Sequence, residues 1–305
     1  MIYSSHADFI ARGCIVCEYF VKTTGLIGIF TRKAAGFMED LLVLGTGYAL
    51  ATRCYNTCFA LQNPTGTVLV DAGGGNGILA RLETAGLDVG CIHDLIVTHE
   101  HCDHVLGVVW MVRAVASRML AGRYEGELTI YCHAGLETVI RTLCGCTLQK
   151  KLTRLFDTRI RFFRVTDGAQ ATLAGRPYTF FSIHSTKAEQ YGFSMELESG
   201  ARLTCLGDEP YNPLCERYAR GADWLLCEAF CLYADRARFK PYEKHHSTAA
   251  DAARLARELD AGHLVLWHTE DTDLAHRKAR YTAEARQHYN GPVFVPDDLD
   301  VLALG

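Results

Sequence analysis

The sequence lacks the features that mark a membrane protein, a disulfide-rich domain or a strongly basic nucleic-acid binder. No apolar run approaches the roughly 20 residues that a membrane-spanning helix needs, so we expect no membrane association. The 31 basic and 35 acidic residues give a net charge of −4, which is not the basic excess of a typical nucleic-acid-binding domain. The 13 cysteines lack the dense spacing of a disulfide framework, so we expect reduced thiols and a cytoplasmic protein.

What remains is an ordinary globular composition. Hydrophobic residues make up 49% and charged residues 22% of the 305 residues, which is enough to build a sizeable core. Residues 1–37 differ from the rest, because their short apolar patches are interrupted by basic residues and resemble no cleavable signal. A strand pattern starts just after Met38. We therefore expect an N-terminal extension over residues 1–37, to which we assign no function, and one domain over residues 38–305.

Strand and helix patterns alternate along this domain, which predicts an α/β protein. The expected strands cover 41–44, 68–70, 94–98, 128–132, 178–183, 202–206, 224–227 and 264–267. The expected helices cover 78–85, 105–120, 135–145, 211–219, 248–260 and 272–288. Thr248 and Asp251 have the spacing of a capping box for the helix at 248–260.

The strongest chemical signal is the segment His99-Glu100-His101-Cys102-Asp103-His104, which directly follows a predicted strand. In extended backbone, His99 and His101 point the same way and can bind one cation. Asp103 and His104, at the turn into the next helix, can face a second cation. Nitrogen and oxygen ligands without thiolate suit Zn²⁺ or a similar divalent ion in a catalytic site.

This His-x-His-x-Asp-His segment resembles the metal motif of the metallo-β-lactamase superfamily. Three further residues match the superfamily order, and each follows a predicted strand: His184, Asp208 and His268. The resemblance implies a metallo-β-lactamase-type αββα sandwich over residues 38–305, with two mixed β-sheets flanked by helices.

The resemblance also implies a ligand set for two divalent ions. Zn²⁺ is the first candidate, with Mn²⁺ or Fe²⁺ as alternatives. One ion would be bound by His99, His101 and His184, the other by Asp103, His104 and His268, and Asp208 would bridge them. Asp71, at the end of the predicted strand 68–70, would fix a ligand imidazole rather than bind metal.

A second pattern narrows the resemblance to the ribonuclease Z branch. Glu228 ends a predicted strand, and His246 begins a His-Ser-Thr segment before a helix. In that branch a metal-bridging hydroxide attacks phosphorus, the His protonates the leaving oxygen and the Glu orients the His. The resemblance carries these roles to His246 and Glu228, and a role at the nucleophile to Asp103. The alternative is that His246 merely flanks a helix start.

The sequence differs from that of ribonuclease Z in the features with which ribonuclease Z binds tRNA. The interval between His184 and Asp208 is too short for the long basic arm, and the segment 269–273 after the last His is acidic. The sequence therefore predicts a phosphodiester hydrolase, either a tRNA 3′-processing endonuclease or a small-molecule phosphodiesterase. A hydrolase of thioesters, lactones or sulfate esters is the alternative, and a non-catalytic metal-binding protein ranks third. Partners would be an RNA or small phosphodiester substrate and, by family analogy, a second copy in a homodimer.

Overall fold

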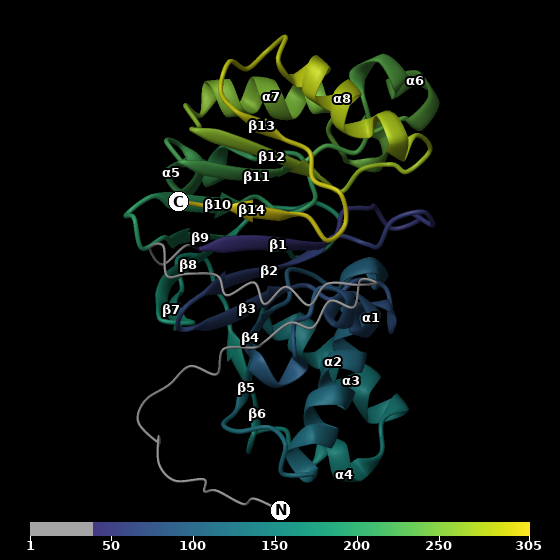
Figure 1. Cartoon of the computed structure of the whole chain (residues 1–305), viewed down its shortest axis with the longest axis vertical. Helices are drawn as coiled ribbons and strands as arrows, with labels where there is room; N and C mark the ends of the chain where they lie inside the picture. The colour runs from purple at the N-terminus through teal and green to yellow at the C-terminus, as the bar shows by residue number, and fades with distance from the viewer. Residues whose placement is uncertain (1–38) are drawn as a thin grey trace, which may run out of the picture. The chain divides into compact units, whose positions relative to one another are not determined.

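Two mixed β-sheets form the framework of the protein in this computed structural model, which describes residues 39–305 (Figure 1). The first seven-stranded sheet has the order β14 (Val301–Ala303), β1 (Asp40–Gly45), β2 (Cys58–Asn63), β3 (Gly66–Val70), β4 (Ile92–Ile96), β5 (Leu128–Cys132) and β6 (Ile160–Arg164). The second has the order β13 (Val293–Phe294), β12 (His263–Trp267), β11 (Trp224–Glu228), β10 (Arg202–Cys205), β9 (Tyr191–Glu196), β8 (Arg176–Ser182) and β7 (Gln170–Leu173). In each sheet one half is antiparallel and the other half parallel.

Helices cover the outer face of each sheet, which confirms the predicted αββα architecture (Figure 1). The first sheet carries α1 (Gly77–Thr84), α2 (Cys102–Leu120), α3 (Ala134–Thr147) and α4 (Lys150–Thr153). The second carries α5 (Glu216–Ala219), α7 (Ala249–Glu258) and α8 (Leu274–Ala285), with α6 (Arg236–Phe239) between β11 and α7 in the chain.

The alternation of side chains along β1 shows how the layers are held together. Leu41 and Val43 pack into the core between the two sheets, whereas Leu42 and Leu44 pack into the core under the first helical layer. Successive side chains of a strand point to opposite faces, so a strand that is covered on both sides reads as a continuous apolar run. A third core lies between the second sheet and α7 and α8.

The parallel halves of the sheets bring the chemically active residues to one edge of the sandwich. In the first sheet, Asp71 follows β3 and the segment from His99 follows β4. In the second sheet, Asp208 follows β10 and His268 follows β12. The carboxyl ends of parallel strands are where ligands bind in such sheets. Asp71 and His268 also leave their strands with φ of 54° and 55°, a conformation that costs energy and is found at functional sites.

Most of the expected elements are present, with some differences at their ends. The short interval between His184 and Asp208 is filled by a hairpin of β9 and β10, in antiparallel register with Arg202 opposite Glu196. The capping box of α7 is present, because the Thr248 and Asp251 side chains each bind the other's backbone N–H. Helix α2 begins at Cys102, earlier than predicted, so Asp103 and His104 lie in its first turn.

The domain over 38–305 forms one compact unit, and the extension over residues 1–37 lies outside the described residues. The buried cysteines are free thiols: Cys58, Cys132, Cys144, Cys205, Cys215, Cys227 and Cys231. Within residues 39–305, no helix is both long and apolar enough to cross a bilayer.

Candidate metal centre

One carboxylate oxygen lies at the middle of the site. Oδ2 of Asp208 is 3.6 Å from Nε2 of His99, 3.4 Å from Nε2 of His104 and 3.5 Å from Nε2 of His268. These distances are long for hydrogen bonds, but two ligands bound to one tetrahedral Zn²⁺ at about 2.0–2.1 Å would lie about 3.4 Å apart. The atoms are therefore spaced as ligands around cations.

Hydrogen bonds on the far side of two imidazoles fix which ring nitrogen faces the centre. The Thr98 hydroxyl donates to Oδ2 of Asp71 at 2.8 Å, so it is free to accept from Nδ1 of His99 at 3.0 Å. The same oxygen of Asp71 accepts from Nδ1 of His104 at 2.8 Å. With the proton on Nδ1, each Nε2 presents a lone pair to the centre.

The third imidazole, that of His268, is oriented in the same way by the loop between β1 and β2, residues 46–57. The Thr57 hydroxyl donates to the carbonyl oxygen of Gly47 at 3.1 Å and can accept from Nδ1 of His268 at 3.2 Å. Three ring nitrogens and a carboxylate oxygen thus meet in a buried space. Nε2 of His99 lies 2.8 Å from Nδ1 of His101, and Nε2 of His104 has no hydrogen-bond partner. Such a group of acceptors needs a cation, so the residues fit the divalent metals that the sequence predicts.

The pKa directions agree with a cation site. Burial lowers the pKa of His99 to about 4 and that of His268 to about 3, so both are neutral metal-ligand forms at physiological pH. Burial acts in the same direction on His104, but the carboxylates of Asp71 and Asp103 outweigh it and raise its pKa well above the ordinary value. Positive charge is therefore favoured at the His104 imidazole, and a cation bound at Nε2 would take the place of a proton there.

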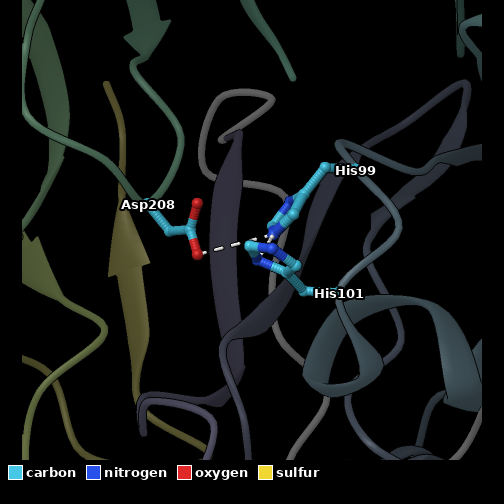
Figure 2. Close-up of side chains that lie close together, drawn as sticks. All are labelled: His99, His101 and Asp208. Atoms are coloured by element: carbon cyan, nitrogen blue, oxygen red, sulfur yellow. Dashed lines mark hydrogen bonds and ion pairs between the residues drawn. The ribbon is translucent and has the colours of Figure 1, made fainter. Parts of the chain in front are cut away.

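The potential ligands fall into two groups. His99, His101 and Asp208 form one, and Figure 2 shows the three side chains turned toward one another. Asp103, His104 and His268 form the other. In each group the ligand atoms lie within 4.8 Å of one another. Six of the seven predicted ligands are thus close together, and Asp208 is shared in space by both groups.

His184 lies outside both groups. It follows β8 with φ of 57°, its side chain is exposed, and its backbone N–H binds the Ser182 hydroxyl. Its role as a ligand to the ion of His99 and His101 stays a prediction.

The predicted proton donor, His246, lies against Asp208, the predicted bridging residue. Nδ1 of His246 is 3.0 Å from the carbonyl oxygen of Asp208 and 3.7 Å from Oε2 of Glu228. Burial alone would lower the pKa of His246, but the Glu228 carboxylate outweighs burial and raises it. Glu228 is fully buried, and Ser247 donates its backbone N–H and hydroxyl to the other carboxylate oxygen. Because a carbonyl oxygen accepts only, Nδ1 of His246 carries a proton and Nε2 is left for substrate.

The acidic segment after His268 is largely structural. Asp271 is buried and accepts hydrogen bonds from the backbone N–H groups of Thr52 and Arg53, at 2.6 and 2.8 Å. Glu270 is also buried and binds the backbone N–H of Thr272. The Asp271 carboxylate thus holds the loop at residues 52–53, and the Glu270 carboxylate closes a turn at Thr272, so neither is an exposed acidic group.

Comparison with known proteins agrees with this geometry. Residues 67–269 match the family model described as a β-lactamase superfamily domain. The chain belongs to this superfamily. Within it, the ribonuclease Z of Pyrobaculum calidifontis is 30% identical over 87% of this chain and 98% of the relative. The ribonuclease Z of Pyrobaculum arsenaticum is 27% identical over the same shares of the two chains. The ribonuclease Z branch is therefore confirmed.

Solved structures show the same fold. The metallo-β-lactamase fold protein YhfI from Bacillus subtilis superposes with a TM-score of 0.69 and 19% identity, over 87% of this chain and 99% of that one. The short form of human tRNase Z superposes with a TM-score of 0.64 and 22% identity, also over 87% and 99%.

Proposed function

We propose that this chain is a binuclear metallohydrolase that cleaves phosphodiester bonds. The observation that carries the proposal is the position of Oδ2 of Asp208, 3.4–3.6 Å from the three imidazole nitrogens that face it. The ribonuclease Z relatives support the same reaction class, and they do not favour the alternative of a thioester, lactone or sulfate-ester hydrolase.

The chain's own residues divide the chemistry between them. Two divalent ions, Zn²⁺ in the first instance and Mn²⁺ or Fe²⁺ otherwise, would activate water and stabilise negative charge on the attacked phosphate. His99, His101, Asp103, His104, His184, Asp208 and His268 would hold them. Asp71 would keep Nε2 of His104 directed at its ion. Asp103, in the first turn of α2, would also accept a hydrogen bond from the attacking water and orient it.

His246 supplies the proton that the leaving group needs. Breaking a phosphodiester releases an alkoxide, which is a poor leaving group unless it is protonated as the bond breaks. The carbonyl of Asp208 fixes Nδ1 of His246, and the charge of Glu228 favours the protonated ring. The Nε2 proton passes to the leaving oxygen, and the neutral imidazole is reprotonated from solvent.

Two substrates fit this site. The ribonuclease Z relatives, matched over nearly their full length, favour an RNA phosphodiester such as a tRNA 3′ trailer. The short β9–β10 hairpin, which occupies the interval between His184 and Asp208, favours a small phosphodiester, because it leaves no room for a tRNA-binding arm.

We also infer a cytoplasmic homodimer. Leu106 and Trp110 are each 38% exposed and lie one turn apart on α2, so they give that helix an apolar ridge. Sedimentation of the wild type and of Trp110→Glu tests this, since a charge in a dimer interface would give monomers.

The reaction class is tested with a substrate panel. Metal-loaded protein should hydrolyse bis(p-nitrophenyl) phosphate and lose this activity in Asp208→Asn. Asp223→Asn should keep it, because Asp223 precedes β11, at the opposite end of that strand from Glu228, and accepts from the backbone N–H of Arg202. Preference for a precursor tRNA over the small diester, with strong salt dependence, would assign the RNA substrate. Turnover of a thioester with none of any phosphodiester would contradict the proposal.

A further inference from the structure

The side chain of Gln190, which is not one of the predicted metal ligands, binds the carboxylate of Asp208. Gln190 immediately precedes β9 and is only 2% exposed. Its side-chain nitrogen donates a hydrogen bond to Oδ1 of Asp208 at 2.6 Å. Oδ1 is thereby engaged, while Oδ2 of the same carboxylate faces the imidazoles of His99, His104 and His268.

The chain makes room for this contact at Gly207. This residue has φ of +83°, and a Cβ atom placed on it would lie 2.8 Å from the side-chain nitrogen of Gln190. Any side chain at 207 would therefore push the amide away from Asp208. Gly207 adjoins the bridging residue, so the two features act on the same hydrogen bond.

Backbone hydrogen bonds fix Gln190 on both sides. Its own carbonyl oxygen accepts from the N–H of Ile183, at the end of β8. The next residue, Tyr191, donates its N–H to the carbonyl oxygen of Thr98, which directly precedes His99. Gln190 is thus anchored between the two sheets at the level of the metal centre, and its amide has little freedom to follow a moving carboxylate.

We propose that Gln190 is a positioning residue of the metal centre, holding Oδ1 of Asp208 so that Oδ2 alone is presented to both metal positions. This inference rests on the metal centre proposed above and not on the identity of the substrate. A free carboxylate can rotate and bind one ion through both oxygens, which would leave the other ion with one ligand fewer. Residues that hydrogen-bond a metal ligand on the side away from the ion typically contribute a factor of about 10–100 in metal affinity.

The amide suits this role better than a charged group would. A carboxylate at position 190 would lie within hydrogen-bond distance of Asp208 and repel it, and a longer basic side chain would compete with the ions for the same carboxylate. An amide donates a hydrogen bond without neutralising the charge that attracts the cations.

Gln190→Met tests the proposal, because it keeps the length of the side chain and removes the donor. Gln170→Met, on the exposed face of β7, is the matched control. Zinc is titrated into metal-free protein in competition with a chromophoric chelator. We expect wild type and control to bind two ions per chain, and Gln190→Met to bind the weaker ion about 10–100 times less tightly. The visible spectrum of the Co²⁺-loaded variant should also change, since Oδ1 becomes free to bind.

Gly207→Ala gives a second, independent variant. It should weaken binding of the same ion, and the double variant should be little worse than either single variant, because both remove one hydrogen bond. The melting temperature of each metal-free protein shows whether it folds, and the increase in that temperature on adding zinc is the reported quantity.

Several results would overturn the proposal. One is wild-type affinity for both ions, with an unchanged Co²⁺ spectrum, in Gln190→Met; another is fully additive effects in the double variant. A wild-type protein that binds fewer than two ions would overturn it as well. If two ions bind as expected and no phosphodiester is hydrolysed, the proposed function fails while the role of Gln190 stands.

Discussion

Nδ1 of His246 donates to the main-chain carbonyl of Asp208 over 3.0 Å, so the predicted proton donor is held by the backbone of the residue whose side chain would bridge the metal positions. A displacement of Asp208 would therefore move the proton donor together with the metal ligands. The position of the proton donor relative to the proposed metal centre is therefore set within one residue.

His246→Ala should slow the reaction according to the leaving group. A nitrophenolate leaves without help, so hydrolysis of bis(p-nitrophenyl) phosphate should fall little. Alkoxide-releasing RNA or alkyl diesters should lose about 10²–10⁴-fold in kcat. His245→Ala, at the exposed neighbouring position, is the control. Equal losses on both kinds of substrate would show that His246 has only a structural role.

His184→Ala tests the one predicted ligand that the structure leaves apart from the rest. If His184 joins His99 and His101 around an ion, metal analysis should fall from two ions per chain toward one. His245→Ala again serves as control, because His245 is also exposed and has φ of 55°. Two retained ions in His184→Ala would remove His184 from the ligand set.

Thr57→Val should weaken metal binding without touching a ligand. The change keeps the shape of the side chain and removes the hydroxyl that accepts from Nδ1 of His268. The imidazole can then turn or change tautomer, and we expect about 10–100-fold lower zinc affinity. Thr204→Val, whose hydroxyl binds the Tyr218 carbonyl, should bind zinc normally. Isothermal titration of zinc into the metal-free proteins makes the comparison.

The capping box of α7 predicts an acid-dependent contribution to stability. Burial tends to raise the pKa of Asp251, but hydrogen bonds from Thr248, Arg254 and Tyr242 outweigh it and lower the pKa below its ordinary value. The stabilisation is therefore present above about pH 4, the ordinary pKa of Asp, and is lost as the pH falls through the folded-state pKa.

Asp251→Asn should accordingly lower the stability of the metal-free protein near neutral pH by about 1 kcal/mol, a shift of a few degrees in melting temperature. The difference from wild type should shrink below pH 4. A gap that stays constant down to pH 3 would contradict the assignment.

The sequence predicted the metal ligands best where residues of ligand type follow an apolar strand. The segment from His99 to His104 was predictable because four potential ligands follow one strand within six positions. Asp208 and His268 were predictable because each ends an apolar strand, and parallel strands bring their carboxyl ends to one edge.

Asp71 was predicted as a residue that orients a ligand imidazole, because a carboxylate directly follows an apolar strand, but the neutral residues that orient the other ligands were not predictable. Thr57 reaches His268 across 211 positions, and Gln190 reaches Asp208 across 18. Both are neutral and of common types, so no charge or spacing marks them; their partners are set by how the two sheets face each other. Strands β2, β6, β7, β13 and β14 were also missed, since their short sequences carry no strong period-two pattern.

The ligands come from both halves of the sandwich, with His99 to His104 following a strand of the first sheet and Asp208 and His268 following strands of the second. Ions bound there would act as cross-links between segments far apart in the chain, much as a disulfide does in a secreted domain. Removing the ions with a chelator would therefore do more than abolish hydrolysis. It would also remove the cross-link between the two sheets at their catalytic edge and make that edge more accessible to proteases.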